Sequence, residues 1–287
     1  MCRVRPRWRA AAEEAGEVGA EFKITVDTAP LVEREAARAA GLGWQGKNTC
    51  LIHPGKGSWF FLGSIVTSLD LGLELAPEDA PALPDRCGSC TRCLEACPTQ
   101  ALTPYAMDAR RCIAYLNIEL RGAIPEGLRA GMGNNVLGCD LCQDVCPWNR
   151  RAAVSVAPEF QPRPGLFAPP LAELAGMSED DYRERFRHSA VKRAKYAGLR
   201  RNVAVAMGNS GNPGFLPILQ EWIAGEDAVL AEHAAWAARQ LQPAGLERDG
   251  LERDGLEPDA STESLPGWAG SGAAGRTDGR TAGQRPK

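Results

Sequence analysis

Eight of the ten cysteines in this chain lie between residues 87 and 146, and this crowding limits the possible folds more than any other feature. In the first run, the spacing C-x2-C-x2-C-x3-C-P is formed by Cys87, Cys90, Cys93, Cys97 and Pro98. Such a run is typical of a loop that binds a [4Fe–4S] cluster. Three thiolates hold one cluster, and the fourth, next to the proline, holds another. The first run therefore predicts two clusters.

A second run supplies the remaining ligands. Cys139, Cys142 and Cys146 repeat the pattern without its first cysteine, because position 136 is Val. Cys112 lies upstream and can take the missing place. The eight cysteines are then enough for two sites of four cysteines each, which we name cluster A and cluster B. Cluster A would use Cys87, Cys90, Cys93 and Cys146, and cluster B would use Cys97, Cys112, Cys139 and Cys142.

Two structural zinc sites are the alternative use of eight cysteines. Zinc modules space their ligands as paired C-x2-C units, whereas this chain carries the longer run with a following proline, so iron–sulfur binding is favoured. The two remaining cysteines, Cys2 and Cys50, are predicted to be ordinary thiols. Two neighbouring clusters conduct electrons, so the rest of the chain should show where the electrons go.

Composition places the chain among soluble globular proteins, with 44% hydrophobic and 24% charged residues. A net charge of −3 gives no global basic field, so a nucleic-acid surface would have to be local. There is no run of eighteen apolar residues for a membrane span, and no apolar segment follows the arginine-rich N-terminus as in a secretory signal. We therefore expect a cytoplasmic monomer with no membrane contact.

Residue patterns predict helices and strands before the cysteines. The predicted elements are a helix over 7–21, a strand over 21–27, a helix over 31–41, and two strands over 49–53 and 58–68 joined by a PGKG turn. A linker rich in proline and acidic residues follows over 74–86.

After the cysteines, residues 151–181 are loosely patterned and rich in proline. Helical periodicity then recurs over 199–209, 215–225 and 227–241, which indicates two or three short helices of a repeat. From residue 245 onward the sequence is of low complexity and is predicted to be disordered.

The segment from Gly41 to Asn48 nearly matches a nucleotide-binding P-loop. Asn48 replaces the hydroxyl that would bind Mg²⁺, and the predicted helix precedes the strand instead of following it, so nucleotide hydrolysis is disfavoured. The simple alternative is a glycine-rich turn. The functional interpretation is a backbone that lies close to a large planar or anionic ligand, with Lys47 and Asn48 as polar contacts.

Asp27 lies between a predicted strand and a predicted helix. This position favours a role as a helix N-cap over a catalytic one. The carboxyl group could still donate a proton if burial raised its pKa.

Six blocks, in order, resemble the epoxyqueuosine reductases, which are cobalamin-dependent iron–sulfur enzymes of tRNA modification. Five of them are VDTAPLVEREAARAAGLGWQGKNTCLI, GSWFFLGSIVTSLDL, DRCGSCTRCLEACPTQAL, RRCIAYLNIELRGAIP and GNNVLGCDLCQDVCPWN. The sixth, HSAVKRAKYAGLRRNVAVAMGNSGNPGFLPIL, resembles the family's C-terminal HEAT-like repeat. The resemblance runs from about residue 21 to 242. Only about twenty residues precede the matching blocks. We therefore expect the family's N-terminal part to be missing from this chain, through a misassigned start or a truncation.

The resemblance implies that the epoxide of epoxyqueuosine in the tRNA anticodon loop is reduced, giving queuosine and water. Two clusters would deliver electrons from a flavodoxin-type or ferredoxin-type donor to base-off cobalamin. The reduced cobalt would attack the epoxide, and Asp27, aligned with the family's acid, would protonate the departing oxygen. Arg121 aligns with a basic residue near the tRNA. The positions aligned with the family's cobalamin pocket are Leu51, Leu62, Ala114 and Asp140, beside Asp27, Lys47 and Asn48.

A basic stripe over residues 183–201 offers a local surface for nucleic acid. Its cations are Arg183, Arg185, Arg187, Lys192, Arg193, Lys195, Arg200 and Arg201, and within the stripe only Glu184 opposes them. We expect Arg200 and Arg201 to contact tRNA phosphates. The alternative is a solvated helix face.

Together these patterns predict an α+β chain with four parts. They are a partial cobalamin-binding α/β domain over 1–78, a bacterial-ferredoxin-like two-cluster domain over 79–157, a HEAT-like helical repeat over 158–243 and a disordered tail over 244–287. Two other functions remain open. One is a two-cluster electron-transfer module, or a truncated inactive reductase, without cobalamin chemistry. The other is a relative of the cobalamin-dependent reductive dehalogenases, which the absence of an export signal disfavours.

Overall fold

A computed structural model describes residues 10, 13–14, 19–27, 29–69 and 83–242 of the chain. The predicted tail over 244–287 and Cys2 lie outside the described residues, as do most of the helix predicted over 7–21 and of the linker predicted over 74–86. No helix in the described ranges has the length and apolar character needed to span a membrane.

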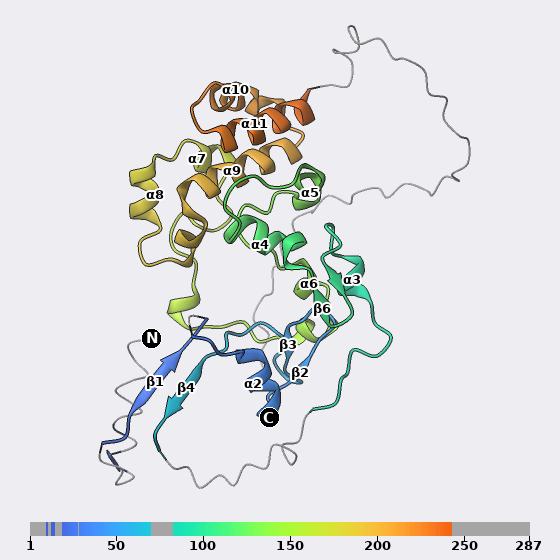
Figure 1. Cartoon of the computed structure of the whole chain (residues 1–287), viewed down its shortest axis with the longest axis vertical. Helices are drawn as coiled ribbons and strands as arrows, with labels where there is room; N and C mark the ends of the chain where they lie inside the picture. Colours follow the sequence, from blue (N-terminus) through green and yellow to red (C-terminus); the bar gives the residue numbers. More distant parts are fainter. Residues whose placement is uncertain (1–9, 11–12, 15–18, 28, 70–82, 243–287) are drawn as a thin grey trace, which may run out of the picture. The chain divides into compact units, whose positions relative to one another are not determined.

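Before the cysteines, two short antiparallel strand pairs flank one helix. Strand β1 (Phe22–Thr25) pairs with β4 (Ser64–Thr67), as Figure 1 shows, and β2 (Trp44–Gln45) pairs with β3 (Leu51–Ile52). Helix α2 (Glu33–Ala39) lies between β1 and β2 in the sequence, and it contacts β2 and β3. The predicted strand over 21–27 and helix over 31–41 are confirmed, with shorter bounds.

The glycine-rich segment has a packing function. A Cβ atom added to Gly43 would overlap the Ile52 carbonyl group, and one added to Gly46 would lie 2.5 Å from Ile52 Cδ1. Only glycine therefore allows β2 to lie this close to β3. These glycines are therefore needed for packing, and the ligand-binding interpretation of this segment stays a prediction.

The predicted hairpin over 49–68 is wrong in its pairing. The PGKG turn does close an isolated bridge between His53 and Gly57. The chain then leaves the extended pattern, because the Ser58 amide donates to Asn149 Oδ1 at 2.6 Å and Gly57 packs on the Asn149 backbone. This long-range contact ties residues 57–58 to the cysteine region, so β3 and β4 each pair with an earlier strand.

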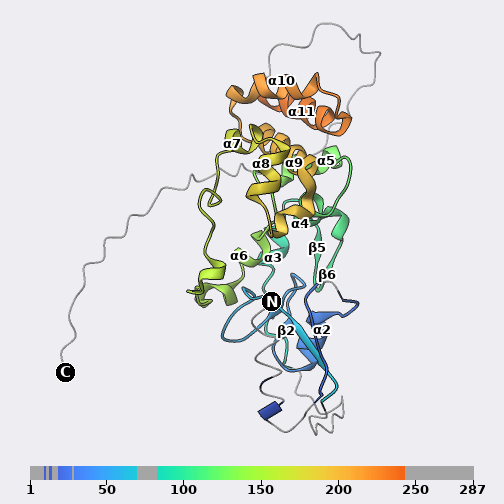
Figure 2. The ribbon, with the colours of Figure 1, turned by 90° about the vertical axis from the view of Figure 1, so that its left-hand side faces the viewer.

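The cysteine region consists of short elements that repeat. Helices α3 (Arg92–Glu95) and α6 (Leu141–Asp144) each begin inside a C-x2-C unit, end before a Cys-Pro pair and pack against each other. Strands β5 (Leu102–Thr103) and β6 (Ala106–Met107) form a small hairpin (Figure 2). The other elements are η1 (Ala109–Arg111), α4 (Ile113–Ile118), α5 (Glu126–Arg129), η2 (Ala130–Met132) and η3 (Pro147–Arg151), where η denotes a 3₁₀ helix.

The C-terminal described part is helical. Helix α9 (Lys195–Asn209) packs against α11 (Ala228–Leu241), and α10 (Leu216–Ile223) runs beside α11 (Figures 1 and 2). The three predicted helices over 199–209, 215–225 and 227–241 are confirmed. Preceding or joining them are η4 (Pro158–Phe160), α7 (Leu171–Ala175), α8 (Glu179–Arg185), η5 (Ala190–Ala194) and η6 (Pro213–Phe215).

One hydrophobic core joins the helices to the cysteine region. Leu116 and Ile124 belong to the same buried cluster as Val203 and Trp236. His233 is fully buried in α11 and accepts a hydrogen bond from the Ile124 amide through Nε2, at 3.0 Å. Burial lowers the pKa of His233 to about 4, so the imidazole is neutral at pH 7 and can accept this bond. The helices are therefore part of the support of the cysteine site.

Candidate iron–sulfur site

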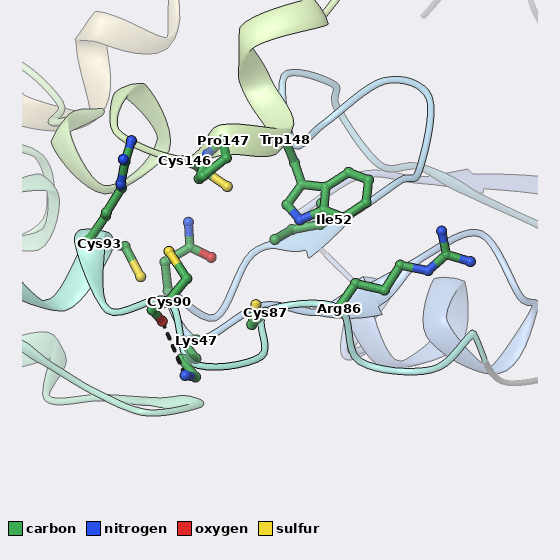
Figure 3. A pocket seen from close by; sticks show the side chains of 11 residues that line it. Lys47, Ile52, Arg86, Cys87, Cys90, Cys93, Cys146, Pro147 and Trp148 are labelled. Carbon is green, nitrogen blue, oxygen red and sulfur yellow. Dashed lines mark hydrogen bonds between the residues drawn. The ribbon is translucent and has the colours of Figure 1, made fainter.

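Four cysteines from both runs line one cavity of about 270 Å³. Cys87, Cys90 and Cys93 come from the first run, and Cys146 comes from the second. Figure 3 shows Cys146 across the space from Cys90 and Cys93, on a separate segment of the chain. These are the four residues predicted for cluster A, so the folded chain brings the predicted set together.

The donor chemistry of this cavity suits a cationic group that binds sulfur. Burial and the neighbouring thiols raise the pKa of Cys93 to about 11. Burial also raises the pKa of Cys146, and the thiols of Cys87 and Cys90 add to the effect. Four thiolates cannot gather here without a compensating positive charge, and iron supplies such a charge. The cavity thus matches a thiolate-bound iron site.

An unpartnered indole lies in the same buried cluster. Trp44 is 2% exposed and packs with Ile52 and Cys146, and its ring meets the Trp148 ring edge-to-face with centroids 4.8 Å apart. Its Nε1–H is buried without a hydrogen-bond partner among the described residues. A buried donor without a partner is costly, and cluster sulfides are acceptors for such N–H groups. This orphaned donor is a second feature that fits an iron–sulfur group.

The cysteines predicted for cluster B are only partly gathered. Burial raises the pKa of the Cys139 thiol, and Cys142 and Cys112 add to this effect. These three cysteines therefore lie near one another. Cys97 Sγ accepts a hydrogen bond from the Ala101 amide at 3.3 Å. No three described His, Cys, Asp or Glu side chains converge on a point for a single metal ion. Cys142 also adds to the raised pKa of Cys93, so the two groups of cysteines lie next to each other.

Cys50 is the cysteine whose surroundings the sequence does not reveal. The structure places it against Cys142, and the two thiols share a hydrogen bond. This bond lowers the pKa of Cys50 and raises that of Cys142. The two residues are 92 positions apart in the sequence, and no local pattern connects them.

Lys47 and Asn48 line the cavity and bind the backbone of the cysteine region, while their expected role as ligand contacts stays a prediction. Lys47 Nζ donates to the carbonyl oxygens of Gly88, at 2.6 Å, and Cys90, at 3.1 Å. Asn48 is 3% exposed and donates through Nδ2 to the Cys142 carbonyl at 3.2 Å. The two adjacent side chains therefore hold the loops of both cysteine runs.

Replacing Lys47 with Met should loosen the loop of cluster A. The methionine fills similar space but leaves the Gly88 and Cys90 carbonyls without their charged donor, a loss of about 1–3 kcal/mol. We expect a lower thermal midpoint and less iron retained after desalting than in the unchanged chain. Lys56→Met, in the exposed PGKG turn, is the matched control. Equal iron retention in the two variants would show that the hydrogen bonds of Lys47 are dispensable.

The positions aligned with a cobalamin pocket lie on several elements. Leu51 is buried in β3 beside Cys50, Ala114 is half-buried in α4 two residues after Cys112, and Asp140 is exposed beside Cys139. Asp140 lies close enough to Cys50 for its charge to act on that thiol. Leu51 and Asp140 thus border the second group of cysteines. Half-buried Leu62 lies in the segment before β4.

Asp27 is not a helix N-cap, so that expectation is wrong. Helix α2 begins at Glu33, six residues later, and its N-cap is Val32. The Asp27 amide instead donates to Glu33 Oε1 at 3.0 Å. The Asp27 side chain is exposed, and the residue adopts a φ of 54°, which is uncommon for a non-glycine residue. The carboxyl is thus presented on a constrained loop.

The expected phosphate contact of Arg201 is wrong. This side chain is 2% exposed, and it donates to the carbonyls of Leu116, Leu120 and Gly122 at 2.7, 3.1 and 2.6 Å. Helical periodicity turns it inward, against the cysteine region. Burial lowers its pKa to about 10, so it remains a cation at pH 7.

The other cations are less free than a basic stripe suggests. The Arg200 guanidinium lies 5.0 Å from the Trp222 ring centroid and is half-buried. Arg121 is exposed, but it donates to the carbonyls of Ile118 and Arg193. Acidic residues outside the stripe neutralise part of it through the ion pairs Arg183–Glu179, Arg183–Asp180, Arg185–Glu173 and Arg193–Glu119.

Two buried asparagines support the second cysteine run. Asn117 donates to the carbonyls of Asn135 and Gly138 and accepts from the Gly138 amide. Asn202, in α9, donates to the carbonyls of Asn117 and Val136. These bonds shape the turn that ends immediately before Cys139. Only the presence of asparagine in otherwise apolar helical segments could have drawn attention to them.

Comparison with known proteins gives these features a family. Residues 86–149 match the family of 4Fe-4S double cluster binding domains. The epoxyqueuosine reductase of Xanthomonas campestris is 45% identical over 229 residues, covering 79% of this chain and 62% of that protein. The Escherichia coli epoxyqueuosine reductase is 44% identical over 224 residues, covering 78% of this chain and 58% of that protein.

Solved structures agree. The epoxyqueuosine reductase of Bacillus subtilis, with its catalytic aspartate loop swung out of the active site, matches with a TM-score of 0.73 and 29% identity over 84% of this chain and 62% of that one. An epoxyqueuosine reductase with an epoxyqueuosine-modified tRNA stem loop matches with a TM-score of 0.69 and 31% identity over 83% of this chain and 62% of that one. Since its relatives share this sequence and fold, the chain belongs to the epoxyqueuosine reductase family and spans about three fifths of the length of the curated members it matches.

Proposed function

We propose that this chain carries the reductive core of an epoxyqueuosine reductase. The reaction adds two electrons and two protons to the epoxide of epoxyqueuosine in tRNA and yields queuosine and water. The observation that carries the proposal is the single cavity lined by Cys87, Cys90, Cys93 and Cys146, in a chain 45% identical to such an enzyme. A relative bound to a modified tRNA stem loop supports tRNA as the partner.

The cysteines would bind two neighbouring clusters. Lys47 and the buried asparagines would hold the cysteine loops in place. Bound in these sites, the clusters supply transfer of single electrons. Lys47 and Asn48 fix the loops of both runs, and Asn202 fixes the turn before Cys139. Rigid ligands limit the movement that accompanies a change of charge on each cluster.

Cobalamin is the group that would open the epoxide, and we place it against the second group of cysteines. Leu51 and Asp140 would border it, with Ala114 near Cys112. An apolar residue and an exposed carboxylate near the same cysteines suit a large ligand with an apolar face and amide substituents. Loading of cobalt in this chain is therefore part of the test below.

Asp27 is the proposed proton donor to the oxygen that leaves the carbon. Its exposed carboxyl lies on a loop with a constrained backbone, and the Bacillus subtilis relative has a catalytic aspartate loop that is swung out of its active site. A loop of this kind can bring a carboxyl group to a bound substrate and withdraw it afterwards. Arg121 and the exposed cations Arg187 and Lys192 are the proposed contacts to tRNA phosphates.

Asp27→Asn should abolish turnover without disturbing the cofactors. A general acid contributes about 10²–10⁴-fold, so product formation should fall at least a hundredfold. Product is measured by mass spectrometry of nucleosides from digested tRNA. Iron and cobalt are measured on the same sample and should remain near eight irons and one cobalt per chain.

Asp180→Asn, on the exposed face of α8, is the matched control and should leave turnover unchanged. Normal product formation by Asp27→Asn would remove Asp27 from the mechanism. If the unchanged chain retains about eight irons but no cobalt and forms no product, the chain is a two-cluster electron-transfer module instead.

A further inference from the structure

The loop of cluster A opens to the surface between exposed arginines. An outer hollow is lined by Cys87 and Cys90, by the loop residues between them, and by Arg92 and Arg150. Gly88, at the tip of this loop, has a φ of 51°, and no atom lies within 4 Å of the place where its Cβ would be. Gly88 is exposed, with Lys47 Nζ bound to its carbonyl, and a protein surface can approach the cysteines there.

Positive charge predominates around this hollow and the adjoining cavity. Arg86, Arg92, Arg150 and Arg151 are exposed, and none of them forms an ion pair with any described residue. Figure 3 shows Arg86 next to Cys87, among the side chains that line the cavity. We name these four arginines the arginine rim.

The nearby acidic groups are already engaged. The Asp85 carboxylate accepts from the Tyr105 hydroxyl and the Cys87 amide. Glu95 accepts from the Thr91 hydroxyl. These neutral donors leave each carboxylate its negative charge, so the four arginines of the rim outnumber the two nearby acids and the surface stays positive. The stripe over 183–201, in contrast, loses three of its arginines to ion pairs with Glu119, Glu173, Glu179 and Asp180.

We infer that the arginine rim is the docking site of an acidic electron-carrier protein that reduces cluster A. Opposite charge guides the encounter, and the open Gly88 tip lets the carrier approach the cysteines, which matters because electron tunnelling falls steeply with distance. The other group of cysteines borders Leu51 and Asp140, the side at which the proposed function places cobalamin, so the inference rests on that proposal for the direction of flow.

The step balances with one electron. The reduced carrier loses one electron and becomes oxidised, cluster A gains it, and no atom or proton moves. Two such encounters supply the two electrons that the epoxide requires.

The test measures reduction of the reconstituted full chain by a reduced acidic ferredoxin, followed anaerobically by stopped-flow absorbance. In the unchanged chain the second-order rate should fall as salt rises. Arg92→Glu/Arg150→Glu should lower the rate about tenfold or more at low salt. The same variant should be reduced at least as fast as the unchanged chain by the methyl viologen radical cation, whose charge is opposite to that of the ferredoxin.

Two further variants keep the result decisive. Lys23→Glu/Arg239→Glu, on exposed residues outside both the rim and the proposed tRNA contacts, is the matched control and should leave reduction by ferredoxin unchanged. If the double rim variant retains less iron, the single variant Arg150→Glu decides, because Arg150 lies outside both cysteine loops. It should still slow reduction of the chain by ferredoxin but not by methyl viologen.

Equal rates for the rim variant and the unchanged chain with ferredoxin would overturn the inference. It would also be overturned if the rim variant were slowed equally with both reductants, or if it instead lost affinity for a tRNA stem loop. Failure of the proposed function is distinguishable, since it would leave the salt-dependent reduction intact and remove only the conversion of the epoxide.

Discussion

Cys146→Ser should remove the same cluster as Cys87→Ser, although the two residues belong to different runs. Both side chains line the cavity of cluster A, whereas Cys142, only four residues before Cys146, is grouped with Cys112 and Cys139. A [4Fe–4S] cluster that loses one of its four thiolates is held weakly, so each single variant should fall from about eight irons per chain to about four. This is among the largest effects the structure predicts.

The decisive comparison uses pairs of substitutions. Cys87→Ser/Cys146→Ser should retain about four irons, like either single variant, because both changes affect one cluster. Cys87→Ser/Cys142→Ser should retain almost none. Iron is quantified per chain, and electron paramagnetic resonance of the reduced samples identifies which cluster remains.

Cys50→Ser is the control for the loss of a thiol near the site, and it should keep both clusters. If Cys146→Ser and Cys142→Ser remove the same cluster, the exchange of the fourth ligand between the runs is wrong.

The grouping of Cys87, Cys90, Cys93 and Cys146 could be predicted because each run has a known ligand spacing, in which the cysteine before the proline serves the other cluster. The two runs share one spacing, and α3 and α6 begin at the same place within it, so each fold of the loop follows from a few neighbouring residues. The same holds for α9, α10 and α11, whose apolar periodicity is read over single segments. Where a short pattern determines the structure, sequence reasoning succeeds.

Roles that depend on distant contacts could not be predicted. Lys47 donates to Gly88, 41 residues away, and Asn48 donates to Cys142, 94 residues away. In the sequence both looked like polar residues of a ligand-binding turn. The pairing of β1 with β4 is of the same kind, because it joins residues as far apart in the sequence as Thr25 and Ser64. Nothing in the residues around any of these positions encodes the partner.

Arg201→Met should destabilise the whole chain. The substitution keeps much of the side-chain volume but removes one buried hydrogen bond, to the Leu116 carbonyl, and two part-buried ones, to those of Leu120 and Gly122. Each unpaired buried group costs about 1–3 kcal/mol, and the guanidinium's own desolvation cost is recovered, so we expect a net loss of about 3 kcal/mol. Urea denaturation of the iron-loaded chain measures it as a shift of the midpoint.

The comparison variants separate burial from charge. Arg187→Met, at an exposed position of the same stripe, should change stability by less than about 0.5 kcal/mol. Arg201→Lys keeps the charge but cannot reach three carbonyls from one ammonium, so it should remain destabilised.

If Arg201→Met is as stable as the unchanged chain but binds tRNA weakly, the residue acts on phosphate after all. If it is unstable, and if Arg187→Met and Lys192→Met alone weaken tRNA binding, two residues of the same charge in one stripe divide into a structural and a binding role. Burial at 2% exposure favours the second result, because a phosphate cannot reach a guanidinium already enclosed by the carbonyls of α4 and the turn that follows it.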